Sequence, residues 1–274
     1  MARVLILSSF VAASRVGGGA QALALARLGI EPILAPTVLY GRHPGHGAPG
    51  GAAVSPETLA SVLTGIEAQG TFAALDAVIT GYFATPEQVA VAVDRLQRIK
   101  AAAPAAQIVV DPIMGDAPGG LYVREETAEA IATLLVPRAD VVAPNAWELQ
   151  RLSGLEVEGP STALRAAERL GRPALVSSVR ADADIGIVYA NGAGAWLATH
   201  AEASAAPKGV GDLLTGYFTA ALIQGLAGGE ALAAAAGALA DIVAAVQGLA
   251  DPPMASLPTK LASSPRVRLE ALHG

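Results

Sequence analysis

Residues 107–116 read QIVVDPIMGD and join a short run rich in β-branched residues to a polar loop. A short apolar run of this kind, bounded by a turn signal, is typical of a strand buried in a parallel sheet. In an open parallel sheet the ligand crevice lies beyond the carboxyl ends of the strands. Polar residues that directly follow such runs are therefore where we look for chemistry.

The same pattern continues along the 274 residues in both directions. Strands are predicted at residues 4–7, 33–37, 77–80, 107–110, 141–143, 174–177 and 186–189. Helices are predicted at residues 19–28, 55–69, 86–102, 125–134, 145–153, 161–170, 212–224 and 230–247. The alternation predicts a parallel sheet covered by helices. No linker divides the chain, so we expect one domain over residues 1–274. The Gly/Pro-rich tract 41–52, called the flap below, is predicted to be a mobile loop without elements of its own.

Composition excludes several classes of protein. The chain is 53% hydrophobic, but alanine supplies much of this, and the apolar stretch 226–250 is interrupted by Glu230, Asp241 and Gln247, which argues against a membrane helix. The net charge is −6 without a basic cluster, so we expect no nucleic-acid partner. The absence of cysteine excludes a disulfide framework and a thiolate metal site, and suits a cytoplasmic protein.

Two carboxylates, Asp111 and Asp116, stand five residues apart in the loop after the predicted strand 107–110. An Asp-Pro pair is often only a turn former. The additional Asp116 favours a role in holding Mg²⁺ or phosphate, because hard cations prefer oxygen ligands.

The run PNAWE, residues 144–148, also follows a predicted strand and opens a helix. Asn145 as N-cap and Glu148 three residues later form a capping box, which satisfies helix amides without any ligand. A carboxylate that faces the crevice from this position could also hold hydrated Mg²⁺. Both roles remain open.

Residues 209–212, GVGD, precede an apolar helix. Gly209 and Gly211 let backbone amides converge at a helix N-terminus and form a cradle for negative charge. Asp212 beside the cradle would take a proton from an attacking hydroxyl in phosphoryl transfer, or would merely cap the helix. The chain contains no P-loop motif.

A glycine run at residues 17–19 follows Val16 and satisfies a loose dinucleotide-binding pattern with Ala22. No acidic residue follows the second predicted strand to hold a ribose. The run is therefore better interpreted as a close turn between a strand and a helix.

Together these motifs resemble the pyridoxal kinase branch of the ribokinase-like superfamily. The resemblance spans nearly the whole chain and rests on Ser9, DAVITGY (76–82), DPIMGD (111–116), Tyr122, APNAWEL (143–149) and KGVGDLLTG (208–216). It implies a three-layer α/β/α fold with a central, mostly parallel sheet, and a homodimer. It also implies ATP-dependent phosphorylation of the 5′-hydroxymethyl group of pyridoxal, together with pyridoxine and pyridoxamine.

The resemblance assigns roles to individual residues. Asp212 is implied to be the catalytic base, and Gly209 and Gly211 the anion hole. The implied Mg²⁺ ligands are Asp116 and Glu148, and a monovalent cation stays open. The implied nucleotide-binding residues are Asp111, Asn145, Glu148, Ser177, Lys208 and Val210. The pyridine pocket is implied to be lined by Ser9, Val16, His43 and Tyr82.

The sequence departs from the family at Phe10, Gly18 and Pro44, where relatives have His, Asn and Thr. The departures concern substrate recognition rather than catalysis, and three alternatives stay open. A hydroxymethylpyrimidine or related heteroaromatic-alcohol kinase would share the catalytic residues. A pyridoxal phosphate carrier would keep the fold without turnover. A dehydrogenase is the third alternative, and the absence of an acidic residue to hold the ribose of a dinucleotide argues against it.

Overall fold

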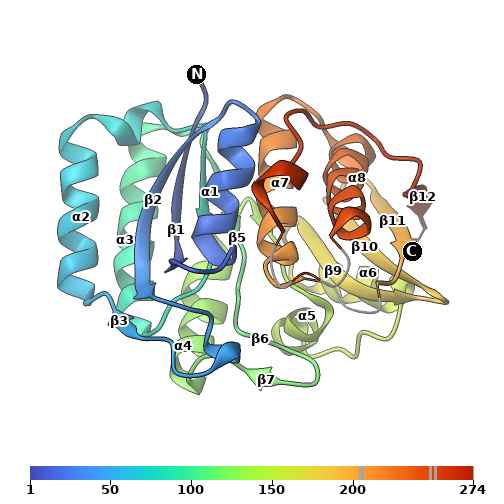
Figure 1. The fold of residues 1–274 in the computed structure, drawn as a ribbon, viewed down its shortest axis with the longest axis horizontal. Helices are drawn as coiled ribbons and strands as arrows, with labels where there is room; N and C mark the ends of the chain where they lie inside the picture. The colour runs from blue at the N-terminus through green and yellow to red at the C-terminus, as the bar shows by residue number, and fades with distance from the viewer. Residues whose placement is uncertain (204–206, 247–248, 250–251, 274) are drawn as a thin grey trace.

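The structure, a computed structural model, describes residues 1–203, 207–246, 249 and 252–273, and it is built around a ten-stranded sheet (Figure 1). The strand β1 (Arg3–Val11) is buried on both faces because Val4 and Ile6 pack in one core and Leu5 and Leu7 in another. Side chains alternate across a strand, so a continuous apolar run requires cover on both sides.

The strand order is β12-β11-β10-β9-β8-β5-β4-β1-β2-β3. Its members are β2 (Glu31–Tyr40), β3 (Gly51–Ala53), β4 (Ala77–Thr80), β5 (Gln107–Val110), β8 (Val141–Val142), β9 (Ala174–Ala181), β10 (Asp184–Ala190), β11 (Ala195–Ala201) and β12 (Arg268–Leu272). From β2 to β9 the pairs are parallel, and the pairs at both ends are antiparallel. Because β1 pairs with β2 on one side and β4 on the other, the order reverses at β1, which is where α/β sheets bind ligands.

Helices cover both faces of the sheet, which confirms the predicted three-layer fold (Figure 1). One face carries α1 (Gly17–Arg27), α7 (Val210–Ile223) and α8 (Gly228–Ala245). The other carries α2 (Pro56–Ala68), α3 (Pro86–Ala102), α4 (Glu125–Ala130), α5 (Ala146–Ser153) and α6 (Pro160–Arg169).

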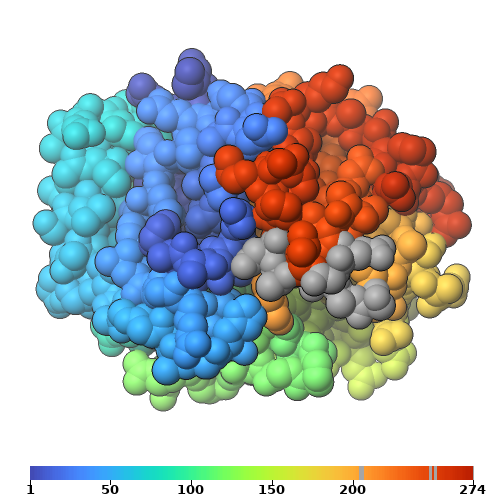
Figure 2. Space-filling view, in the orientation of Figure 1, coloured from blue at the N-terminus to red at the C-terminus, as the bar shows by residue number. Residues whose placement is uncertain are grey.

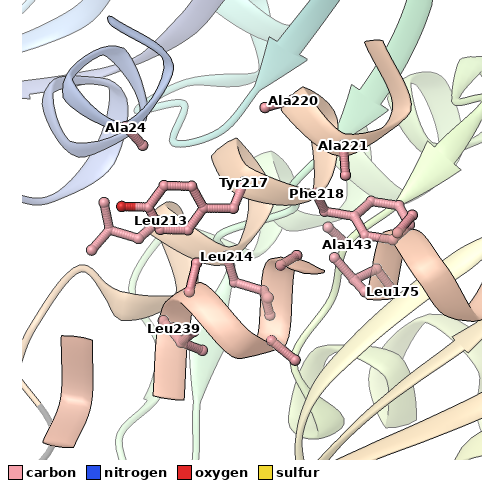
Figure 3. Close-up of a cluster of buried hydrophobic side chains, with 14 of the residues drawn as sticks. Ala24, Ala143, Leu175, Leu213, Leu214, Tyr217, Phe218, Ala220, Ala221 and Leu239 are labelled. Carbon is pink, nitrogen blue, oxygen red and sulfur yellow. The ribbon is translucent and has the colours of Figure 1, made fainter. Parts of the chain in front are cut away.

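Small side chains let α1 and α7 pack closely. A Cβ built on Gly216 of α7 would lie 3.4 Å from the Cβ of Ala24 in α1. Around this contact Tyr217 and Phe218 fill the space between the helices and the sheet (Figure 3). The alanine-rich composition therefore serves close helix packing, which holds the beginnings of α1 and α7 together.

Among the described residues, α8 is the one helix long and apolar enough to cross a membrane, and 67% of it is buried inside the protein. It packs in the same core as α7. This is the burial typical of a core helix; residues 247, 248 and 250 of the stretch considered in the sequence lie outside the described residues.

The prediction that the flap lacks elements is wrong. It contains the 3₁₀ turn Pro44–His46, and Gly51–Ala53 forms β3, an edge strand paired with β2. Gly-Ala-Ala has no β-branched residue, and its strand form depends on backbone pairing with residues 38–40 of β2. The strands β11, which pairs with β10, and β12, which pairs with β11, were not predicted either. The helix predicted at 125–134 is α4 followed by a π-helical turn, Ile131–Leu135. The remaining 3₁₀ turns are Thr71–Ala74, Val136–Arg138 and Met254–Ser256.

Candidate active site

The beginning of α7 is shaped by Gly209, its N-cap, which has a φ of 84°. A Cβ at this position would lie 2.1 Å from the carbonyl oxygen of Arg15, so the left-handed conformation and the close approach both require glycine. Gly211 differs, because a Cβ there would meet no atom within 4 Å, and the residue is exposed. One glycine thus builds the turn and the other leaves open space in front of the helix.

Asp212 lies in the first turn of α7, three residues after the N-cap. Its Oδ2 accepts a hydrogen bond of 2.8 Å from the backbone N–H of Gly17, at the beginning of α1. Its Oδ1 is buried and has no hydrogen-bond partner among the described residues. The alternative that Asp212 caps α7 is therefore wrong, because the N-cap is Gly209 and the carboxylate points to a neighbouring helix.

Burial raises the pKa of Asp212 from its usual value of 3.8 to about 6, although the Gly17 amide acts in the opposite direction. A carboxylate that titrates close to neutral pH is a better proton acceptor than an ordinary one, and it is still largely ionised at pH 7. The pair of an orphaned oxygen and a raised pKa is typical of a general base.

Gly17 explains why two helix beginnings meet here. Its φ is 58°, and a Cβ on it would lie 1.9 Å from the Oγ of Ser9 in β1. Gly18 lies close to Leu34, because a Cβ built on Gly18 would lie 2.5 Å from the Cδ1 of Leu34. The interpretation of the glycine run as a close turn between strand and helix is confirmed.

Asp111 follows β5 directly and is buried. Its Oδ2 accepts a 2.8 Å hydrogen bond from the hydroxyl of Thr215 in α7. Burial, followed by the charges of Asp212 and Glu148, raises the pKa of Asp111 well above its usual value. The carboxylate after β5 is therefore tied to the same helix turn as Asp212.

Asn145 and Glu148 form the predicted capping box of α5. The Glu148 carboxylate also accepts from the backbone N–H of Met114 at 2.7 Å and of Gly115 at 3.3 Å, while the Asn145 amide donates to Gly115 O at 2.8 Å. Burial raises the pKa of Glu148 to about 7. The pair therefore joins α5 to the loop after β5, which a capping role alone does not require.

That loop continues into a two-stranded ribbon, β6 (Gly115–Asp116) and β7 (Gly120–Leu121), which we call the lid. Tyr122, about half exposed, shares a hydrogen bond with the Asp116 side chain, and burial and this contact raise its pKa. The lid and the flap both reach the lower edge of the face seen in Figure 2, where they are green and light blue.

The carboxylates here fit a magnesium ion carried by a nucleotide. Among the described residues, no three Asp, Glu or His side chains form a ready-made metal site. Mg²⁺ usually keeps waters and takes only one or two carboxylates beside substrate phosphates. Burial raises the pKa of Glu148, Asp111 and Asp212, and a bound cation would favour the ionised form of each. Glu148 and Asp116 would be the carboxylates that hold such an ion.

The predicted substrate residues are only partly brought together. Ser9 and Val16 adjoin Gly17, and so lie close to Asp212. Tyr82 follows β4; its N–H donates to Ser8 Oγ at 3.2 Å and its carbonyl accepts from Thr37 at 2.6 Å. Its phenol is partly buried, which raises its pKa. His43 is the N-cap of the 3₁₀ turn in the flap, where its Nδ1 accepts a hydrogen bond of 3.1 Å from the backbone N–H of Gly45.

On the nucleotide side, Asn145 and Ser177 pair in an isolated parallel bridge, with Ser177 N–H donating to Pro144 O at 3.0 Å. Val210 is the first residue of α7, and Lys208 is exposed just before its N-cap. Asn145 lies beyond the carboxyl end of β8, Ser177 lies within β9 beside it, and Lys208 and Val210 lie at the start of α7.

Two contacts were not predicted from sequence. The partner of Asp212 is a backbone amide and has no sequence signal. Thr215, the partner of Asp111, stands three residues after Asp212, and helical spacing could have drawn attention to it.

Comparison with known proteins agrees with this geometry. The model of the phosphomethylpyrimidine kinase family matches residues 49–250. The pyridoxal kinase PdxY of Corynebacterium diphtheriae is 33% identical over 249 residues, which cover 88% of each chain.

Solved structures are similar over the full length. The pyridoxal kinase of Entamoeba histolytica with PLP gives a TM-score of 0.90 at 25% identity and covers 100% of both chains. The pyridoxal kinase of Leishmania donovani in complex with ADP and pyridoxamine gives a TM-score of 0.88 at 23% identity, also over 100% of both chains. The likeness includes the N-terminal residues that the family match does not reach.

Proposed function

Because the chain belongs to the phosphomethylpyrimidine kinase family and is 33% identical over 249 residues to a pyridoxal kinase, we propose that it transfers the γ-phosphoryl group of ATP to the 5′-hydroxymethyl group of pyridoxal. The observation that carries this proposal is the Asp212 carboxylate. It stands at the start of α7 with one oxygen held by Gly17 and the other without a hydrogen-bond partner in the part of the chain that the structure describes. A primary alcohol needs such a group to accept its proton.

In the proposed step, the hydroxyl oxygen of pyridoxal forms a bond to the γ-phosphorus of ATP. Asp212 takes the proton that this hydroxyl loses. The bond from that phosphorus to the β,γ-bridging oxygen breaks, and ADP leaves with the electron pair. Gly17 holds the carboxylate in place through its amide, 2.8 Å away. The protonated Asp212 then returns its proton to solvent.

The amides at the start of α7 are proposed to stabilise charge on the moving phosphoryl group. Gly209 makes the left-handed turn that begins α7, and a Cβ on Gly211 would meet no atom within 4 Å, so the space beside this turn is open. Preorganised amides and a helix dipole favour negative charge without reorganisation during the reaction. Lys208 and Val210, which flank Gly209, would contact the same phosphates.

Asp116 and Glu148 are proposed to hold Mg²⁺, which when bound neutralises phosphate charge. Asp111, Asn145 and Ser177 are proposed to face the nucleotide phosphates. Burial raises the pKa of Asp111 well above its usual value, and a cation beside the phosphates would favour its ionised form. Whether a monovalent cation joins Mg²⁺ is a further part of the proposal.

On the substrate side, Ser9, Val16, Tyr82 and His43 are proposed to surround the pyridine ring. Ser9 and Val16 support this assignment because they adjoin Gly17. His43 would reach the ring only through the flap.

The test is a panel of alcohols with Mg²⁺-ATP, in which ADP release is followed by a coupled assay and the product is identified by mass spectrometry. We expect pyridoxal to give the highest kcat/KM and a product one phosphoryl group heavier. Tight binding of pyridoxal phosphate without transfer to any alcohol would contradict the proposal and favour a carrier.

A second candidate is a kinase for hydroxymethylpyrimidine. The matching family is described as phosphomethylpyrimidine kinase, and Phe10 is 39% exposed near the proposed pocket. The same panel separates the two, because a pyrimidine alcohol would then exceed pyridoxal in kcat/KM.

We further infer a homodimer in the cytoplasm. The resemblance to pyridoxal kinases supports the dimer, and a chain without cysteine suits a reducing compartment. Sedimentation at micromolar concentration tests the dimer.

A further inference from the structure

The structure links the two buried carboxylates of the site through one threonine. Asp111 belongs to the end of β5 and Asp212 to the start of α7, two elements far apart in the sequence. Thr215 donates to Asp111 Oδ2 at 2.8 Å, and it lies three residues after Asp212 on the same helix. Residues three apart on a helix share a face. The hydroxyl thus joins the turn that carries Asp212 to the strand end that carries Asp111.

This contact lies in the interior. Thr215 is 2% exposed and Asp111 is 7% exposed. A buried hydrogen bond to a charged group is among the stronger ones, because water cannot replace the lost partner. Besides Thr215, the group that stabilises the Asp111 charge is the backbone N–H of Ile113.

The start of α7 is held by residues other than its N-cap, Asp212 with its bond to Gly17 among them. Its N-cap is a glycine without a capping side chain, so the first turn depends on contacts farther along the helix. Thr215 Oγ1 is also 3.3 Å from Gly211 O. Since a hydroxyl has a single hydrogen, the shorter contact to Asp111 is its donor bond, and the Gly211 contact is weaker.

We propose that Thr215 is a positioning residue that fixes the Asp111 carboxylate relative to the turn bearing Asp212. This inference rests on the proposed kinase function for its kinetic consequence. Both carboxylates repel each other and the incoming phosphates, so their separation must be held by neutral donors. Thr215 supplies that donor to one carboxylate and Gly17 to the other.

The test compares Thr215→Val with Thr215→Ser and with Thr219→Val. Valine keeps the shape of threonine without the hydroxyl, and serine keeps the hydroxyl. Thr219 is the matched control, because it is fully buried on the same helix and its hydroxyl donates only to Thr215 O, at 2.8 Å. We expect Thr215→Val to lower kcat about tenfold to a hundredfold with KM for pyridoxal nearly unchanged. Thr215→Ser should recover most of kcat, and Thr219→Val should behave as wild type.

A double-mutant cycle gives a readout that general destabilisation would not move. If Thr215 acts through Asp111, then Thr215→Val should add little to the loss caused by Asp111→Ala. Fully additive losses, or equal kcat for the valine variants at 215 and 219, would overturn the proposal.

Failure of the positioning role of Thr215 can be told apart from failure of the proposed kinase function. If the wild-type protein transfers no phosphate to any alcohol, the kinase assignment fails, and the crystal structure of Thr215→Val then decides the positioning role. The proposal requires the Asp111 carboxylate to leave its wild-type position in that structure, and an unchanged carboxylate would refute it. If Thr215→Val does not fold, the comparison of Thr215→Ser with Thr215→Ala replaces it, with the same expected order.

Discussion

At the scale of single residues, Asp212 combines an orphaned buried oxygen with a pKa raised to about 6. Both properties destabilise the folded state, because an ionised carboxylate is costly to bury. The same properties suit a proton acceptor. We therefore expect that removing the charge of Asp212 lowers activity and raises the stability of the fold.

We predict that Asp212→Asn lowers kcat with pyridoxal by roughly 10² to 10⁴, the range expected for loss of a general base. Asparagine can still accept from the Gly17 amide but cannot take a proton. Coupled measurement of ADP release checks this. A variant with more than about a tenth of wild-type kcat would show that Asp212 is not the base.

The same substitution should stabilise the fold above pH 6, by about 1 to 3 kcal/mol. The pKa of Asp212 is raised from 3.8 to about 6 in the folded state, so ionisation opposes folding. This cost is fully present above pH 6, shrinks as the folded carboxyl takes its proton below that pH, and vanishes below about pH 4. Denaturant unfolding at pH 8 and pH 4 tests the sign, and a larger gain at pH 4 would contradict it.

At the scale of elements, the start of α7 needs its two glycines for different reasons. We predict that Gly209→Ala lowers the free energy of unfolding by about 2 kcal/mol or more, because φ is positive there and the new Cβ would strike Arg15. Gly211→Ala should leave stability almost unchanged, since its Cβ meets open space. It should instead weaken phosphoryl transfer by placing a methyl group before the cradle amides. Melting curves and kcat for the two variants check this contrast, which equal losses of stability would contradict.

The loop after β5 and the start of α5 are joined by Glu148, whereas Asp116 projects from the lid. We predict that Asp116→Asn raises the Mg²⁺ concentration needed for half-maximal activity with little change in melting temperature. Glu148→Gln should do the same and also lower the melting temperature by several degrees. A glutamine amide cannot accept on both sides from the three backbone N–H groups that Glu148 now satisfies.

Titration of activity with Mg²⁺ at fixed ATP, beside thermal melts, separates the two roles. A Glu148→Gln protein that melts lower but keeps its Mg²⁺ dependence would show that Glu148 serves only the capping box.

At the scale of the whole molecule, the flap and the lid both border the carboxyl edge of the sheet, on either side of β1. The flap is almost entirely exposed. We predict that residues 41–52 and 117–122 gain protection from amide exchange when ATP and pyridoxal bind together, because closure excludes water from the reaction. Hydrogen–deuterium exchange of free and doubly bound protein measures this, with α3 as an internal reference. Equal protection in the two states would refute closure.

Local sequence determined most of the framework. The bounds of β4, β5 and α3 agree with the predicted ones, because their apolar periodicity, the caps and the flanking prolines act within a few residues. The capping box of Asn145 and Glu148 was readable for the same reason. The strands β3, β11 and β12 were missed, since backbone pairing with a neighbouring strand stabilises them and, for β12, that neighbour lies far back in the sequence.

Tertiary structure alone decided how the site is assembled. Sequence motifs named Asp212 and Asp111, but not that Gly17, 195 positions away, binds the first or that Thr215, 104 positions away, binds the second. Nor did they distinguish a helix cap from a carboxylate directed at another helix. The reason is physical: local propensity fixes which residues end a strand or begin a helix. The packing of α1 against α7, made close by glycine and alanine, fixes which backbone amide and which carboxylate then meet.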